Sequence, residues 1–111
     1  MDERAHRIGL NEAVFREVNE QIRGLSDRFG LEERTLDLIC ECGRPDCTER
    51  ITMSVDDYER VRSDGALFAV IPGHDDDDGA EDVVERAGGY EIVRKRAGHP
   101  AELARQTDPR A

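Results

Sequence analysis

The amino-acid sequence predicts a small α+β domain, in which a long N-terminal helix and one short helix accompany a small, mostly antiparallel sheet. Three observations predict this fold. Apolar residues recur at helical spacing near the N-terminus, short β-rich runs separated by turn residues follow them, and three cysteines lie within one stretch of eight residues. The expected order of elements is α-β-β-α-β-β-β, in a single domain over residues 1–96.

The first predicted element is an amphipathic helix over residues 11–29, with Asn11 as its N-terminal cap and Gly30 just beyond its end. Its apolar residues fall on one face: Val14, Phe15, Val18, Ile22, Leu25 and Phe29. Polar residues fall outside that face: Glu12, Arg16, Glu17, Asn19, Glu20 and Arg23. We expect the apolar face to cover the sheet. The polar face is expected outside, where it serves ordinary ion pairing or, alternatively, recognition of a protein partner.

A hairpin and a short helix are predicted next. Residues 35–40 and 50–53 are short β-rich runs, so the cysteines between them lie near the tip of a hairpin. Ser54 precedes two aspartates in an arrangement like a capping box. A second helix is therefore expected from there to about residue 65.

The remaining strands are predicted from apolar runs and turn residues. Residues 67–71 are apolar and end at Pro72-Gly73, and a last hairpin is expected around Gly88-Gly89. The chain after residue 96 is polar and contains prolines, so residues 97–111 are expected to form a mobile tail, with a short helical turn over residues 101–105 as an option. Residues 1–9 are also expected to be flexible.

The composition limits the classes of function. The formal net charge is −10, from 26 acidic and 16 basic residues, and this charge repels the phosphates of nucleic acids and anionic membrane surfaces. The sequence has no apolar run of the roughly 18 residues that span a bilayer, and its N-terminus does not resemble a signal peptide. We therefore expect a cytoplasmic protein that binds neither nucleic acid nor membrane directly.

The cysteine cluster carries most of the chemical information. In an extended segment, residues two apart share a face, so Cys40 and Cys42 can direct both sulfurs at one point. Gly43 permits a sharp reversal, and Pro45 suits a turn that returns Cys47 to the same point. The spacing therefore predicts a metal site with three thiolate ligands.

Tetrahedral zinc requires a fourth ligand, and His74 is the best candidate because it follows the 67–71 strand on the Pro72-Gly73 turn. His6 and His99 lie in end segments where the pattern is weak. Two other interpretations stay open. The cysteines can be three reduced thiols without a metal, or they can have a redox role that includes a disulfide between Cys42 and Cys47, although the spacing is not that of a C-x-x-C motif.

A closed set of four protein ligands predicts a structural metal, because a catalytic zinc keeps one position open for water or substrate. The sequence contains no glycine-rich phosphate loop, nucleophile elbow or zinc-protease helix, which makes an enzyme the less favoured class. The acidic run at residues 75–78 resembles a calcium loop only in part, because His74 occupies the first ligand position. A solvated acidic loop is expected there.

Three segments together resemble a family of small uncharacterised proteins of high-GC Gram-positive bacteria. They are Asn-Glu-Ala-Val-Phe-Arg-Glu-Val-Asn-Glu-Gln-Ile at 11–22, Cys-Glu-Cys-Gly-Arg-Pro-Asp-Cys-Thr-Glu-Arg-Ile at 40–51 and Phe-Ala-Val-Ile-Pro-Gly-His at 68–74. The resemblance covers about residues 8–95. It implies that the three cysteines and the Pro-Gly-His element occur together, which agrees with the proposed ligand set, and it implies no reaction.

These observations predict a non-enzymatic, zinc-stabilised interaction or regulatory module, with Cys40, Cys42, Cys47 and His74 as ligands of a structural zinc. The alternative is a thiol-based redox or metal-sensing switch. A protein partner is expected to bind through the first helix.

Overall fold

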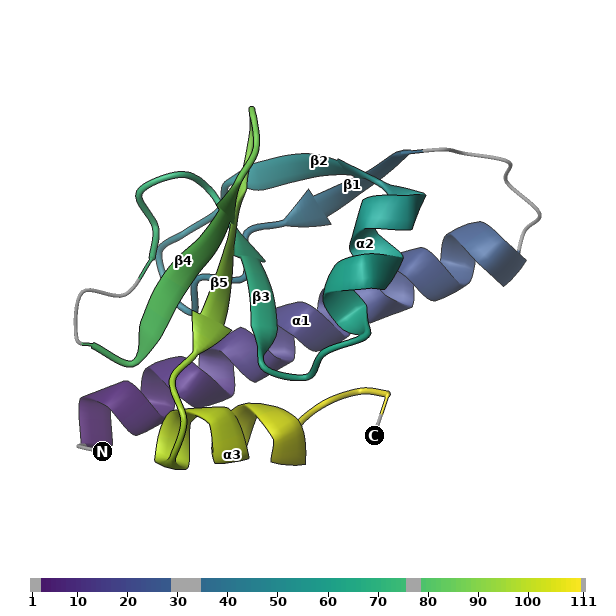
Figure 1. The fold of residues 1–111 in the computed structure, drawn as a ribbon. Helices are drawn as coiled ribbons and strands as arrows, with labels where there is room; N and C mark the ends of the chain where they lie inside the picture. Colours follow the sequence, from purple (N-terminus) through teal and green to yellow (C-terminus); the bar gives the residue numbers. More distant parts are fainter. Residues whose placement is uncertain (1–2, 29–34, 76–78, 111) are drawn as a thin grey trace.

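The computed structural model describes residues 3–28, 35–75 and 79–110 (Figure 1). Its elements, in chain order, are α1 (Glu3–Arg28), β1 (Thr35–Ile39), β2 (Arg50–Ser54), α2 (Val55–Arg62), β3 (Leu67–Val70), β4 (Glu81–Arg86), β5 (Glu91–Lys95) and α3 (His99–Gln106). The predicted α+β class and the predicted order α-β-β-α-β-β-β are confirmed, with α3 added at the C-terminal end. In the described part of the chain, no helix is both long and apolar enough to cross a membrane.

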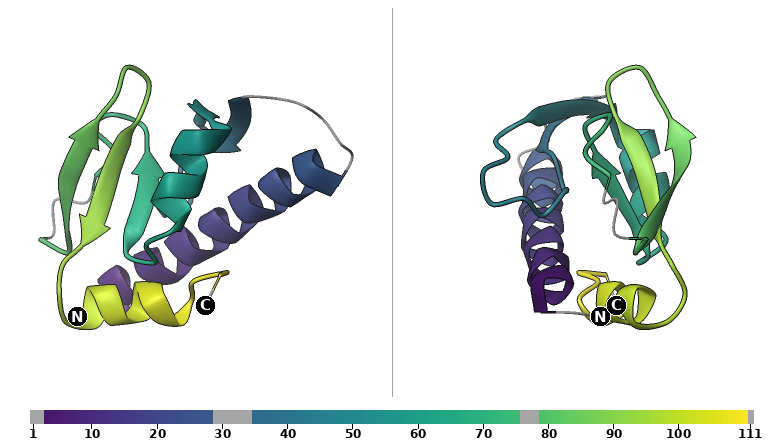
Figure 2. Two further views of the ribbon diagram at one scale, coloured as in Figure 1. Left: turned by 45° about the vertical axis from the view of Figure 1, so that its right-hand side comes forward. Right: turned by 90° about the vertical axis from the view of Figure 1, so that its left-hand side faces the viewer.

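The strands form two small antiparallel sheets. One is the β1–β2 hairpin, and the other has the strand order β3-β5-β4. A backbone hydrogen bond connects them, since the N–H of Glu41 donates to the carbonyl of Ala69 over 2.9 Å. Figure 2 shows α1 passing alongside both sheets, with α3 against its N-terminal half. The long helix therefore spans the two sheets rather than covering one of them.

The main core lies between the hairpin, α2 and the second sheet. The hairpin register pairs Leu36 with Met53 and Leu38 with Ile51, and all four side chains are buried on one face, as the alternation of a strand requires. Tyr58 and Val61 of α2 pack against them. The predicted cap of α2 is present, because the Ser54 hydroxyl accepts a hydrogen bond from the N–H of Asp57 at 3.0 Å.

The orientation of α1 differs from the prediction, although Ile22 packs against the core and Glu17 is exposed, as expected. Glu12, Arg16 and Asn19 are at most 1% exposed, whereas four apolar residues are 37–58% exposed: Leu10, Val14, Val18 and Leu25. Helical periodicity shows that a helix has two faces, but it does not show which face has partners. Here the polar face has them: Arg16, for example, donates to the carbonyls of Gly65 and Ala104, both at 2.7 Å. Phe29 and Gly30 lie outside the described residues.

Both ends of the chain also differ from the prediction. The first helix begins at Glu3 rather than at Asn11, so residues 3–9 are helical and Asn11 is not its cap. The expected mobile tail from residue 97 instead includes α3, whose Ala101 and Ala104 are buried. Each end supports the other, because Gly9 lies so close to Leu103 that an added Cβ would come within 2.8 Å of it.

The orientation of α1 predicts the ranking of two substitutions. Arg16→Met removes two hydrogen bonds to buried or half-buried carbonyls and the stacking of the guanidinium on Phe68, 4.4 Å from the ring centre. We expect it to lower the free energy of unfolding by about 2–4 kcal/mol. Val14→Ser alters an exposed side chain and should change the free energy of unfolding by less than about 0.5 kcal/mol. Urea denaturation measures the free energy of unfolding of both variants. A larger loss of stability for Val14→Ser than for Arg16→Met would indicate that the apolar face of α1, rather than its polar face, is buried.

Candidate metal centre

The structure brings together the four residues that the sequence predicts as ligands. Cys40 directly follows β1, Cys42 and Cys47 lie in the loop that leads to β2, and His74 follows the turn after β3. One donor atom from each of them lies within 4.8 Å of all the others. Cys40 and Cys42 are buried, whereas Cys47 and His74 are half-buried. Four donors from two distant segments thus surround one point.

The two sulfur–nitrogen distances from His74 fit a tetrahedral ion. Nδ1 of His74 lies 3.6 Å from Sγ of Cys40 and 3.6 Å from Sγ of Cys47. Metal–sulfur bonds of about 2.3 Å and metal–nitrogen bonds of about 2.0–2.1 Å at tetrahedral angles separate sulfur from nitrogen by roughly 3.5–3.6 Å. The two measured separations agree with that value.

Two tight turns place the half-buried ligands. The N–H of Cys47 donates to the carbonyl of Arg44 at 3.1 Å, which closes the predicted turn through Pro45. The N–H of His74 donates to the carbonyl of Ile71 at 2.9 Å, and Gly73 in that turn has a φ of 88°, in the left-handed region that glycine adopts readily. The local sequence therefore determines where both ligands point.

Backbone N–H groups support the buried sulfurs. The N–H of Ile71 donates to Sγ of Cys40 at 3.2 Å, and the N–H of Arg44 bonds to the sulfur of Cys42. Burial raises the pKa of both thiols above the ordinary value, and these hydrogen bonds only partly oppose it. A bound cation would offset the burial cost of the thiolates, so metal binding and deprotonation are linked. Three sulfurs and one imidazole are donors typical of structural zinc sites, and soft enough for iron as well.

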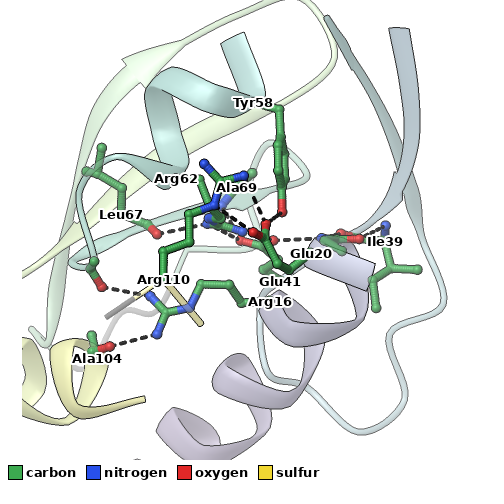
Figure 3. Close-up of polar contacts among 12 residues, drawn as sticks. Arg16, Glu20, Ile39, Glu41, Tyr58, Arg62, Leu67, Ala69, Ala104 and Arg110 are labelled. Carbon is green, nitrogen blue, oxygen red and sulfur yellow. Dashed lines mark hydrogen bonds and ion pairs between the residues drawn. The ribbon is translucent and has the colours of Figure 1, made fainter. Parts of the chain in front are cut away.

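Glu41, between two of the ligands, is a buried residue that the sequence analysis missed. Its carboxylate is fully buried and accepts hydrogen bonds from Arg62 at 2.8 and 3.1 Å, from Asn19 at 2.7 Å and from the N–H of Ala69 at 3.0 Å (Figure 3). Burial disfavours the charge of Arg62, but the Glu41 carboxylate raises its pKa above the ordinary value. The alternation of the Cys-Glu-Cys segment could have identified Glu41, because it must point away from the face that the sulfurs share.

A second buried charge cluster lies between α1, β4 and β5. Nζ of Lys95 donates to both carboxylate oxygens of Glu12, at 2.7 and 2.8 Å, and to Glu81 at 2.6 Å. Burial, together with the neighbouring Glu81, raises the pKa of Glu12 to about 8, although Lys95 opposes the shift. Two carboxyl groups thus share one ammonium group. The helical pattern of the sequence places Glu12 on the exposed face, so it gives no sign of this cluster.

The other candidate donors do not join the metal site. His6 and His99 lie against each other, with ring centres 6.0 Å apart, and neither belongs to the cluster of cysteines. Asp76, Asp77 and Asp78 of the acidic run lie outside the described residues.

Comparison with known proteins finds no match: no protein-family model, no curated protein and no solved structure is similar to this chain. The resemblance to a family of small proteins of high-GC Gram-positive bacteria therefore stays a prediction.

The raised pKa of Glu12 predicts how stability depends on pH. Between pH 4.5 and about 8 the folded protein holds a proton that the unfolded chain releases, so the contribution of Glu12 to stability falls as the pH rises through this window. Glu12→Gln resembles the protonated form and does not titrate. From pH 5 to pH 9 the wild type should lose at least about 2 kcal/mol relative to this variant, since one pKa unit corresponds to about 1.4 kcal/mol.

Urea denaturation at pH 5, 7 and 9 measures this difference. Glu17→Gln, which alters an exposed carboxylate of the same helix, serves as the control and should follow the wild-type profile. Parallel profiles for the wild type and Glu12→Gln would show that Glu12 is ionised throughout.

Proposed function

We propose that this protein is a non-enzymatic interaction module, stabilised by a structural zinc ion that Cys40, Cys42, Cys47 and His74 hold. The observation that carries the proposal is the convergence of four protein donors within 4.8 Å of one another, with two sulfur–nitrogen separations that match a tetrahedral ion. Zinc with four protein ligands has no position for water or substrate, so it stabilises a fold rather than catalysing a reaction. A chain with 5% aromatic residues and no tryptophan has a small core, and domains with small cores depend most on a bound metal for stability.

The outer face of α1 supports the interaction part of the proposal. We use this name for Leu10, Val14, Val18 and Leu25, which are 37–58% exposed along one side of a helix of 26 residues. Contiguous apolar residues on a helix are suited to binding a second helix. Two copies of a chain of net charge −10 repel each other, so charge complementarity favours a partner helix with basic flanks.

The metal half of the proposal predicts one zinc ion per chain and a large effect of removing it. Chelation should lower the melting temperature by more than about 10 °C, because the ion connects segments that are distant in the sequence and a shift of about 4–8 °C corresponds to 1 kcal/mol in small domains. His74→Ala should reproduce the loss of zinc, whereas His6→Ala and His99→Ala should retain it. Metal analysis and calorimetry check these outcomes.

Three results would contradict the structural role. Protein without zinc or iron, with three titratable thiols, would remove the metal altogether. The purified protein could instead hold one zinc ion whose removal leaves the melting temperature unchanged. This result, or reversible oxidation of the thiols, would favour the redox or metal-sensing switch.

The interaction half predicts that the outer face of α1 binds a basic amphipathic helix. A synthetic helical peptide with a leucine face and lysine flanks is the probe, and fluorescence anisotropy measures its affinity. The double variant Val14→Ser, Val18→Ser should weaken binding at least about tenfold, since two partly exposed valines lose their burial. The control is Val84→Ser, because Val84 on β4 is 50% exposed and should not matter. Equal affinities, or a wild-type dimer in sedimentation equilibrium, would overturn this assignment.

A further inference from the structure

The segment that carries two of the metal ligands also carries the contacts to α1. Residues 39–43 alternate: Ile39, Glu41 and Gly43 contact α1, whereas Cys40 and Cys42 contribute to the metal cluster. An extended chain directs successive side chains to opposite sides, so the Glu41 carboxylate points away from the two sulfurs, whereas Ile39 and Gly43 contact α1 through their backbone. The segment is therefore enclosed between the metal cluster and the helix.

Asn19 makes the central contact on the helix side. Its side-chain amide accepts a hydrogen bond from the N–H of Ile39 at 2.9 Å, and donates to the carbonyl of Ile39 at 2.9 Å and to Glu41 at 2.7 Å. It is fully buried. It thus pairs with the edge of β1 as a neighbouring strand would, one residue before the first metal ligand.

The contact around Gly43 is equally restrictive. Asn11 donates to the carbonyl of Gly43 at 3.1 Å. A Cβ on Gly43 would come within 2.7 Å of the Glu12 side chain and of the carbonyl oxygen of Ile8, so α1 lies directly against the backbone here. The metal loop cannot shift toward the helix at this point, and a shift away from it breaks the hydrogen bond of Asn11.

Glu41 connects the helix contacts to the other ligand segment. Its carboxylate accepts from the N–H of Ala69 on β3, and two residues later the N–H of Ile71 donates to Sγ of Cys40. The turn from Ile71 then leads to His74. Both ligand segments are thus joined, through Glu41, to Asn19 of α1.

From this arrangement we propose that metal binding and docking of the middle of α1 are coupled, with Asn19 and Glu41 as positioning residues of the metal site. This inference rests on the proposed metal site and adds its regulation. The inward face of α1 docks mainly through hydrogen bonds, which weaken steeply when donor and acceptor are displaced. Loss of the ion frees residues 40–47, displaces Ile39 and Glu41, and loosens the helix. Coupling between two sites is reciprocal, so disrupting the helix contacts weakens metal binding by the factor by which loss of the metal weakens helix docking.

Metal affinity tests one direction of the coupling. Competition with a chromophoric chelator, using Zn²⁺ and Co²⁺ as probes, compares the wild type with Asn19→Ala and Glu41→Gln. Both variants should bind about 10–100-fold more weakly, the range observed when hydrogen bonds that support a metal site are lost. The Co²⁺ absorption spectrum should keep its tetrahedral, sulfur-rich form, since no ligand changes. The controls are Gln21→Ala, an exposed amide on α1, and Glu49→Gln, an exposed carboxylate in the same loop.

Hydrogen exchange of the wild-type protein tests the other direction and does not depend on whether a variant folds. Removing zinc should accelerate exchange of the α1 amides around Asn19 at least tenfold, and that of the β4–β5 hairpin much less. Unchanged affinities in both variants, or an equal acceleration in α1 and in the β4–β5 hairpin, would overturn the coupling. Either result leaves the zinc site in place, whereas a wild type that binds no zinc would remove the proposed function itself.

Discussion

The buried ion pair between Glu41 and Arg62 is the interaction on which the rest of the structure depends. A carboxylate without solvent is costly unless its lone pairs are satisfied, and Glu41 has four hydrogen bonds from three different elements. Arg62 ends α2, Ala69 lies on β3 and Asn19 lies on α1. Each of these elements must therefore occupy its place if the charge is to be compensated, so one side chain specifies how four parts of the fold meet.

This requirement explains why α1 presents its polar face to the interior. Asn19 satisfies Glu41 and the open edge of β1, Arg16 satisfies two carbonyls, and Glu12 satisfies Lys95. Each contact is directional, so together they determine the position of the helix more sharply than apolar packing would. The cost is that four apolar residues remain outside, on the outer face of α1. The same arrangement that fixes the helix thus creates the surface that we assign to a partner.

The sequence was sufficient for most of the elements and for the cluster of Cys40, Cys42, Cys47 and His74, but not for the orientation of α1. Short β-rich runs, the Ser54 cap and the C-x-C-x4-C spacing depend on local chemistry, which a single sequence contains. The burial of Glu12, Arg16 and Asn19 depends on Lys95, on Ala104 and on Glu41, which are distant in the chain and have no local pattern. The helix at the C-terminal end was missed for the same reason, because Leu103 lies against Gly9, in a part of α1 that was expected to be flexible, and Ala104 packs with the distant Phe68 and Val93.

The four-donor cluster and the Glu41 network lie on opposite sides of residues 39–43, and each must compensate charge that is buried away from water. A thiolate cluster needs a cation to be stable away from water, and a buried carboxylate needs donors held at fixed positions. Because residues 39–43 carry Glu41 together with Cys40 and Cys42, the position of this segment determines both the geometry of the cysteine cluster and the contacts of Glu41. In a chain with few large apolar residues, this shared segment links the side of the molecule that carries the four donor residues to the side that positions α1.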